Sequence, residues 1–141
     1  MSIPTRTAVF GAGLALLAGA ALAGAGPALA KSSISIGVST HAARVGQPVG
    51  VTATGGDDDY SSYTEVCIER LLTVNHRPTW TIVRCSAPTP GYAGGESLHM
   101  TLRYGTAQRS SLRAQLLQTD SRGGHRIGRQ ATPPVVVTIT R

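Results

Sequence analysis

Apolar and polar side chains alternate along most of the chain after residue 31, and clusters of Gly, Pro, Asn and Asp interrupt the alternation. A period of two is typical of strands with one buried face, and the interrupting residues are typical of turns. A helical period is nearly absent from the same part of the chain. The pattern predicts seven strands, at residues 34–38, 49–53, 63–74, 79–85, 98–104, 112–116 and 135–139.

The strands at 63–74 and 79–85 are predicted to form a hairpin. Opposed positions in an antiparallel pair share a constant sum of residue numbers, so Cys67 opposite Cys85 centres the turn on residue 76, among the turn-forming residues 75–78. This register places the cysteines on the face opposite Trp80. It also predicts two further opposed pairs, Leu72 with Trp80 and Arg70 with Ile82.

Seven short strands separated by turn signals predict an all-β fold, an immunoglobulin-like antiparallel β-sandwich of two layers. A small closed barrel is the alternative. The segment 121–134 carries a Gly pair and a Pro pair among polar residues, and it is predicted to be a mobile surface loop.

Residues 1–30 have the order of features expected of a cleavable secretory signal. Arg6 precedes an apolar stretch at 8–25, which ends at Pro27 and is followed by small residues up to Ala30. We expect cleavage after Ala30, one domain at 31–141, and a secreted, extracellular protein without a stable membrane anchor. The alternative is an uncleaved membrane span, which the high Ala and Gly content disfavours.

Cys67 and Cys85 are the only two cysteines of the chain. Two thiols in a small exported domain usually pair because the compartment is oxidising, so we expect one disulfide. Their spacing contains no CxxC motif and supplies too few ligands for a zinc site. The bond is predicted to brace adjacent strands and to contribute roughly 3 kcal/mol to stability.

Several segments together resemble a family, the small secreted immunoglobulin-like proteins of high-GC actinobacteria. They are Val45–Val49, Gly55–Asp57, the Cys67–Trp80–Cys85 arrangement and Leu112–Leu116. Most members of that family have no assigned activity, so the resemblance implies a fold and a compartment but no functional residue. The chain departs from the antibody pattern, because its cysteines lie too close in sequence for the usual bridge between sheets.

The net charge is +6, and the basic residues after residue 31 are spread along the chain. Such a charge favours weak attraction to anionic cell-wall polymers. The chain lacks the basic stripe and the aromatic platform expected of a nucleic-acid-binding protein.

Two groups of residues are candidate binding sites. Asp57, Asp58 and Asp59 lie in a Gly-rich loop and are weak candidates for calcium ligands, although their spacing is not that of an EF-hand. Tyr60, Tyr63 and Tyr92 are candidate binding residues, because tyrosines in polar loops contact sugars and proteins. Packing of Tyr63 at the core margin is the alternative.

The chain shows no catalytic constellation. Its four histidines fall in separate segments, and no G-x-S-x-G motif is present. The predicted function is a secreted, non-catalytic binding or structural module without a cofactor, whose partner is an extracellular protein or an anionic cell-wall polymer. The alternative is an inhibitor of a secreted hydrolase, which would present the loop Ser86–Gly95 with Tyr92.

Overall fold

The computed structural model describes residues 32–59, 61–91, 95–122 and 124–141, so the predicted signal segment lies outside the described residues. Within these ranges, no helix is long and apolar enough to cross a membrane. The strands are β1 (Ser32–Val38), β2 (Ala42–Arg44), β3 (Val49–Asp57), β4 (Tyr63–Val74), β5 (Arg77–Cys85), β6 (Thr89–Pro90), β7 (Glu96–Leu102), β8 (Gln108–Thr119), β9 (Ile127–Ala131) and β10 (Val135–Thr140).

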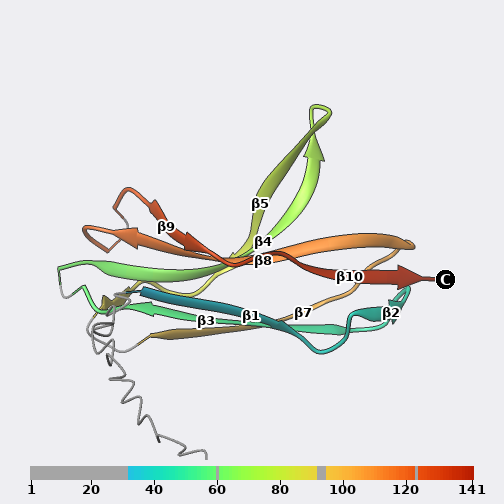
Figure 1. Cartoon of the computed structure of the whole chain (residues 1–141), viewed down its shortest axis with the longest axis horizontal. Coiled ribbons are helices and arrows are strands. Elements are labelled where there is room, and N and C mark those ends of the chain that lie inside the picture. The colour runs from blue at the N-terminus through green and yellow to red at the C-terminus, as the bar shows by residue number, and fades with distance from the viewer. Residues whose placement is uncertain (1–31, 60, 92–94, 123) are drawn as a thin grey trace, which may run out of the picture.

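The strands form two sheets packed face to face (Figure 1). One sheet has the order β1-β3-β7. The other runs β2-β10-β8-β4-β5, with β6 paired to β4 and β9 paired to β8. The short β2 is parallel to β10, and the other pairs are antiparallel. The predicted two-layer, all-β sandwich is therefore confirmed.

The core lies between the two sheets and is built from the alternating positions that the sequence marks. The apolar side chains that β3 and β8 direct into the core are at most 1 % exposed, while their neighbours in sequence turn toward the outer faces. The buried cluster comprises Ala43, Val49, Val51, Ala53, Val66, Ile68, Leu98, Tyr104, Leu112, Ala114, Leu116, Val137 and Ile139.

Three strands were not predicted: β2, β6 and β9. The most consequential is β9, because the segment 121–134 was expected to be a mobile loop and instead contributes a strand paired with β8. All five residues of β9 are exposed, so the strand has no buried face. Its sequence therefore lacks the alternation of apolar and polar residues by which a strand is predicted. It forms because the part of β8 beyond β10 still has main-chain groups to pair.

The predicted β4–β5 hairpin is confirmed, but its register is wrong beyond the cysteines. The turn is the two-residue type, Asn75 and His76, with φ of 49° and 62°, and Val74 faces Arg77 across it. A β-bulge beside Glu69 adds one residue to β5. As a result the opposed pairs are Leu71 with Trp80 and Glu69 with Ile82.

Because of the bulge, Trp80 lies on the opposite face of the sheet from the one predicted. Cys67 and Cys85 are opposed and form the expected disulfide between adjacent strands. Since opposed residues point to the same side of a sheet, Leu71 and Trp80 share the face of the disulfide. Trp80 therefore lies on the outer face of the sheet, not on the face opposite the cysteines as expected.

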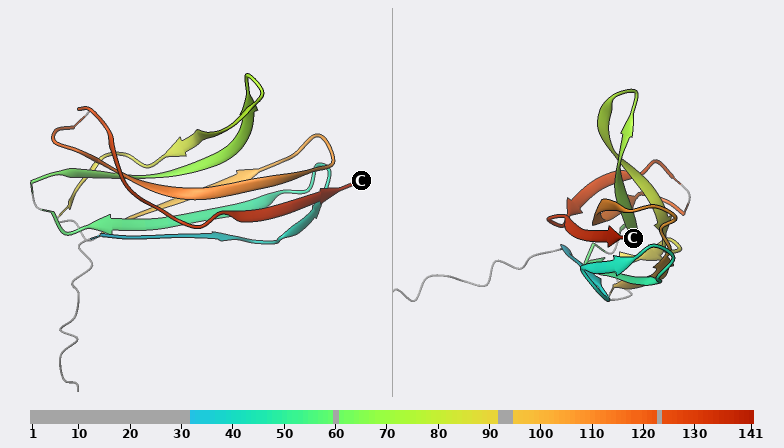
Figure 2. Two further views of the ribbon diagram at one scale, coloured as in Figure 1. Left: turned by 45° about the horizontal axis from the view of Figure 1, so that its top comes forward. Right: turned by 90° about the vertical axis from the view of Figure 1, so that its right-hand side faces the viewer.

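The end of the hairpin extends beyond the sandwich. β8 pairs with β4 only as far as Arg70, and the remaining four residues of β4 continue with β5 alone. Figures 1 and 2 show the tip of this hairpin rising away from both sheets. Leu72 and Val74 lie on the same face of β4 as the buried Val66 and Ile68, but Leu72 is half-buried and Val74 is exposed because no second sheet covers them.

Two variants on the same face of β4 test this description. We expect Ile68→Ala to lower the free energy of unfolding by about 2–5 kcal/mol, because Ile68 is fully buried and its loss leaves a cavity. Val74→Ala should change it by less than about 1 kcal/mol, because Val74 is 44 % exposed. Urea denaturation of both variants measures the difference, and equal losses would mean that the tip of the hairpin is packed.

Candidate interaction surface

The hairpin from Arg70 to Arg84, called here the arm, carries an unusual share of the exposed apolar surface. Six large apolar side chains are exposed among the described residues, and four of them lie in the arm. The four are Leu71, Val74, Ile82 and Val83. An exposed group of this kind on a projecting element is typical of an interaction surface.

The pairing of β4 with β5 sorts the side chains of the arm onto two faces. One face carries Leu71, Trp80 and Ile82 together with the disulfide at the base. The opposite face carries the arm's arginines, Arg70, Arg77 and Arg84. No acidic residue lies between positions 70 and 84, so the arm is basic as well as apolar.

Trp80 is held in place by charged residues of the sheet. The guanidinium of Arg113, on β8, lies 4.4 Å from the centre of the Trp80 ring. Arg113 Nε also donates to Glu69 Oε2 at 2.6 Å, and the Glu69 side chain is only 6 % exposed. Because a cation over an indole face is attractive, this chain of contacts fixes the aromatic side chain at the base of the arm.

A second ion pair covers the outer face of β4. Glu65 is 1 % exposed and its Oε2 lies 2.7 Å from Arg126 Nη2. Glu65 is also close to both cysteine sulfurs, and these three residues are the only group of metal-ligand type that the described residues bring within 4.8 Å. The sulfurs are joined in the disulfide, so this group supplies no thiolate to a metal.

The three aspartates proposed for calcium are directed to different partners. Asp57 is buried, with Oδ2 3.8 Å from Arg129 Nε, while Asp58 is exposed. Asp59 accepts from Ser61. The structure thus places Asp57 at the end of β3 and Asp58 and Asp59 just beyond it, but it does not gather their carboxylates around a common point.

Asp59 has an electrostatic environment that favours its charged form. The Ser61 hydroxyl and main-chain N–H both donate to Oδ1, at 2.7 and 3.0 Å, and Gln118 Nε2 donates to Oδ2 at 2.9 Å. These bonds, those from Ser61 above all, lower the pKa of Asp59 below its usual value. Asp59 therefore orders the loop as a carboxylate.

The candidate tyrosines are only partly placed. Tyr63 begins β4, is half-buried, and faces Pro90 on one side and Thr119 on the other. Tyr60 and Tyr92 lie outside the described residues. The inhibitor hypothesis depended on the loop Ser86–Gly95, of which residues 92–94 lie outside the described ranges and Thr89–Pro90 pair with β4.

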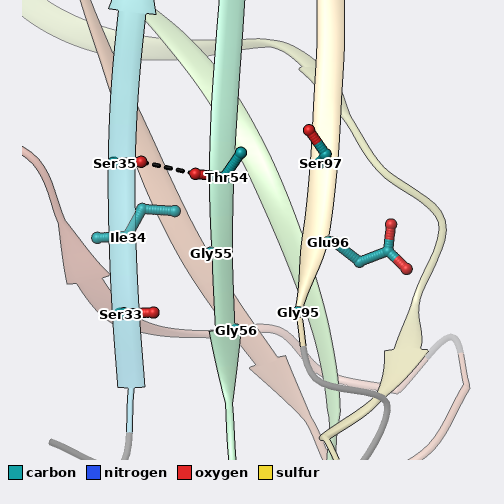
Figure 3. A pocket seen from close by; sticks show the side chains of 9 residues that line it. All are labelled: Ser33, Ile34, Ser35, Thr54, Gly55, Gly56, Gly95, Glu96 and Ser97. Atoms are coloured by element: carbon teal, nitrogen blue, oxygen red, sulfur yellow. Dashed lines mark hydrogen bonds between the residues drawn. The ribbon is translucent and has the colours of Figure 1, made fainter.

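A shallow depression of about 360 Å³ lies along β1, β3 and β7 (Figure 3). It is open because Gly55, Gly56 and Gly95 present no side chains there. The Ser35 and Thr54 hydroxyls bond to each other at 2.6 Å. Glu96, the one charged residue of the lining, accepts a hydrogen bond from Thr89. The depression offers hydroxyl groups to a polar ligand but no converging set of charges.

His99 lies farther along the same outer face and is exposed. Its two ring nitrogens lie 3.0 Å from the hydroxyls of Thr52 and Ser97. The Ser97–His99 contact has the spacing of a nucleophile and its base, but the second nitrogen faces a hydroxyl where a triad has a carboxylate. The geometry is that of a hydrogen-bonded surface histidine.

Sequence reasoning missed the arm, although two signals for it exist. Leu71-Leu72 and Ile82-Val83 are adjacent apolar pairs, which break strict alternation and place apolar groups on both faces of a strand. The absence of any acid between residues 70 and 84 is the second signal. The length over which β8 pairs with β4 determines where the arm begins. This length depends on tertiary structure and cannot be predicted from the local sequence.

No family model matches the chain, and no curated protein matches it. Among solved structures, the chain is similar to the CARDB domain of the PF1109 protein of Pyrococcus furiosus, crystallised in complex with di-metal ions. The sequence identity is 10 % and the TM-score is 0.51, over 77 % of this chain and 91 % of that domain. This likeness supports the β-sandwich fold and extends to the fold alone.

Two further structures match with lower TM-scores. The sporulation control protein Spo0M of Bacillus subtilis has 8 % identity and a TM-score of 0.45, over 79 % of this chain and 50 % of its own. A β-glucosidase of Listeria innocua in complex with glucose has 8 % identity and a TM-score of 0.44, over 77 % of this chain and 16 % of its own. The match therefore spans half of Spo0M and a small part of the glucosidase.

The ion pair beneath Trp80 is tested by removing its cation. We expect Arg113→Ala to lower the free energy of unfolding by about 3 kcal/mol, because it leaves the Glu69 carboxylate buried without its partner. Arg109→Ala is the matched control on the same strand, since Arg109 is exposed, and it should change stability by less than about 0.5 kcal/mol. Equal effects in chemical denaturation would contradict a structural role for the pair.

The acidic loop is tested by titration of its carboxylates, followed by NMR. Asp59 should titrate below the ordinary aspartate value of about 3.9, and Ser61→Ala should raise its pKa toward that value. Because the folded pKa is the lower one, the contribution of Asp59 to stability is present above about pH 4 and is lost as the pH falls through the folded pKa. Ser121→Ala is the control and should leave Asp59 unchanged.

Proposed function

We propose that the protein is an extracellular, non-catalytic binding module that contacts a macromolecule through the arm. The observation that carries this proposal is the projection of the arm from the sandwich with Leu71 and Ile82 exposed on the face of Trp80. Tryptophan and arginine are the residues most enriched in the energetic centres of protein interfaces, and Trp80 and Arg113 are in contact there.

Extracellular location is supported by two independent features. The first thirty residues have the charge, apolar stretch and small residues of a secretory signal. The disulfide between Cys67 and Cys85 is the bond expected in an oxidising compartment. The bond also holds β5 against β4 at the base of the arm.

The test is affinity capture with the oxidised protein as bait, from the culture supernatant and the cell-wall fraction of the producing organism. We expect a macromolecule to be retained by the unchanged protein. Leu71→Ser combined with Ile82→Ser should weaken retention at least about tenfold, because both changes remove apolar groups from the contact face of the arm.

Ile127→Ser is the matched control, because Ile127 is 59 % exposed and lies on β9, away from the arm. It should bind like the unchanged protein. Equal retention by all three proteins would place the binding surface elsewhere. Turnover of a small substrate by the purified protein would contradict the non-catalytic part of the proposal.

A further inference from the structure

One edge of the arm is open, because β5 has a neighbouring strand on one side only in the described ranges. β5 is the last strand of its sheet, and within the described residues it pairs with β4 only. An edge of this kind can accept an additional strand through main-chain hydrogen bonds. Seven of the nine residues of β5 are exposed, so the described part of the chain leaves this edge accessible.

The turn determines which main-chain groups face the open edge. A two-residue turn is closed by a hydrogen bond between the residues that flank it, Val74 and Arg77. Hydrogen-bonded pairs alternate along an antiparallel ladder, so Pro78, Trp80 and Ile82 direct their main-chain groups outward. Pro78 has no N–H to offer, and its place on the outward side explains how β5 tolerates a proline.

The two faces of the arm specify the side chains of an added strand. Side chains of a strand alternate between faces. If the partner passes the bulge at Val83 without a matching residue, as β4 does, its residues on one face lie beside Arg77 and Arg84. The intervening residues would lie beside Trp80 and Ile82. Carboxylates suit the first set and apolar groups the second.

A second copy of the chain fits this edge poorly. Two β5 strands paired about a two-fold axis would bring their arginine-bearing faces to the same side of the joined sheet. Like charges on facing strands are destabilising, and neither copy contributes an acid from the arm.

We infer that the partner is an extended protein segment of alternating acidic and apolar residues, which adds to the β5 edge as a further strand. This inference rests on the proposed function, since it names the partner of the same surface. The contacts are main-chain hydrogen bonds at Trp80 and Ile82, ion pairs on the arginine face and apolar contacts on the tryptophan face.

The test uses fluorescence anisotropy of a short labelled peptide of alternating valine and glutamate, titrated with the oxidised full chain. We expect this peptide to bind and a peptide of alternating valine and lysine not to bind. Arg77→Glu combined with Arg84→Glu should weaken binding at least about tenfold. Arg109→Glu combined with Arg141→Glu is the control, with the same change of charge at exposed positions outside the arm.

The main-chain part is tested by Ile82→Pro, which removes an outward N–H while leaving the ladder with β4 intact. It should weaken peptide binding at least about tenfold, whereas Ile82→Ser keeps the N–H and should lose less. Amide hydrogen exchange of the unchanged protein is the independent measurement. The amides of Trp80 and Ile82 should become protected when the peptide is bound, whether or not the proline variant folds.

Three results would overturn the inference. They are equal binding of the glutamate and lysine peptides, unchanged exchange at Trp80 and Ile82, and dimerisation of the chain that Ile82→Pro abolishes, which would make a second copy the occupant. None of these results changes the outcome of the affinity-capture experiment with the Leu71 and Ile82 variant. Failure of the inference can therefore be distinguished from failure of the proposed function.

Discussion

The disulfide between Cys67 and Cys85 joins β5 to β4 near the point where the arm leaves the sandwich. β5 has no other strand beside it in the described residues, so its attachment depends on one ladder of main-chain bonds and this covalent link. Fraying of an edge strand begins where pairing is weakest. The link closes the base of the arm and leaves its tip as the part free to bend.

The middle of β4, from which the arm continues, is buried on both faces. The inner face contributes Val66 and Ile68 to the core, while the outer face buries Glu65, Cys67 and Glu69. A buried carboxylate needs a partner of opposite charge. Arg113 pairs with Glu69, and Arg126 pairs with Glu65. The middle of β4 is therefore packed on both faces, and the arm continues from a run of six consecutive buried residues, 64–69.

The sequence specifies the sandwich well and the arm poorly, for physical reasons. Val49, Val51 and Leu112 lie where alternation predicts, because one buried face imposes a period of two. The predicted face of Trp80 was wrong, because the bulge at Val83 shifts the register by one residue. A valine is as compatible with a regular strand as with a bulge, so the sequence does not mark this shift. β9 escaped prediction because a strand exposed on both faces leaves no apolar period.

The candidate surface shows the same limit. The cysteine pair could be predicted from composition and compartment, whereas the contact of Arg113 with Trp80 depends on the register of three strands. Among the residues proposed from sequence, Tyr63 is half-buried in β4, and the carboxylates of Asp57 and Asp59 have different partners, Arg129 and Ser61. Local composition located the turn of the hairpin, but it took β9 for part of a loop and could not say which side chains would meet.

The bulge at Val83 adds length to one strand only, and such an insertion bends a strand and increases its twist. Without this residue, the pairs on either side would still face each other, but the local bend would be lost. The direction in which the arm points is therefore separable from the side chains it presents. Insertion or deletion at this joint would let evolution re-aim a binding element while conserving its specificity.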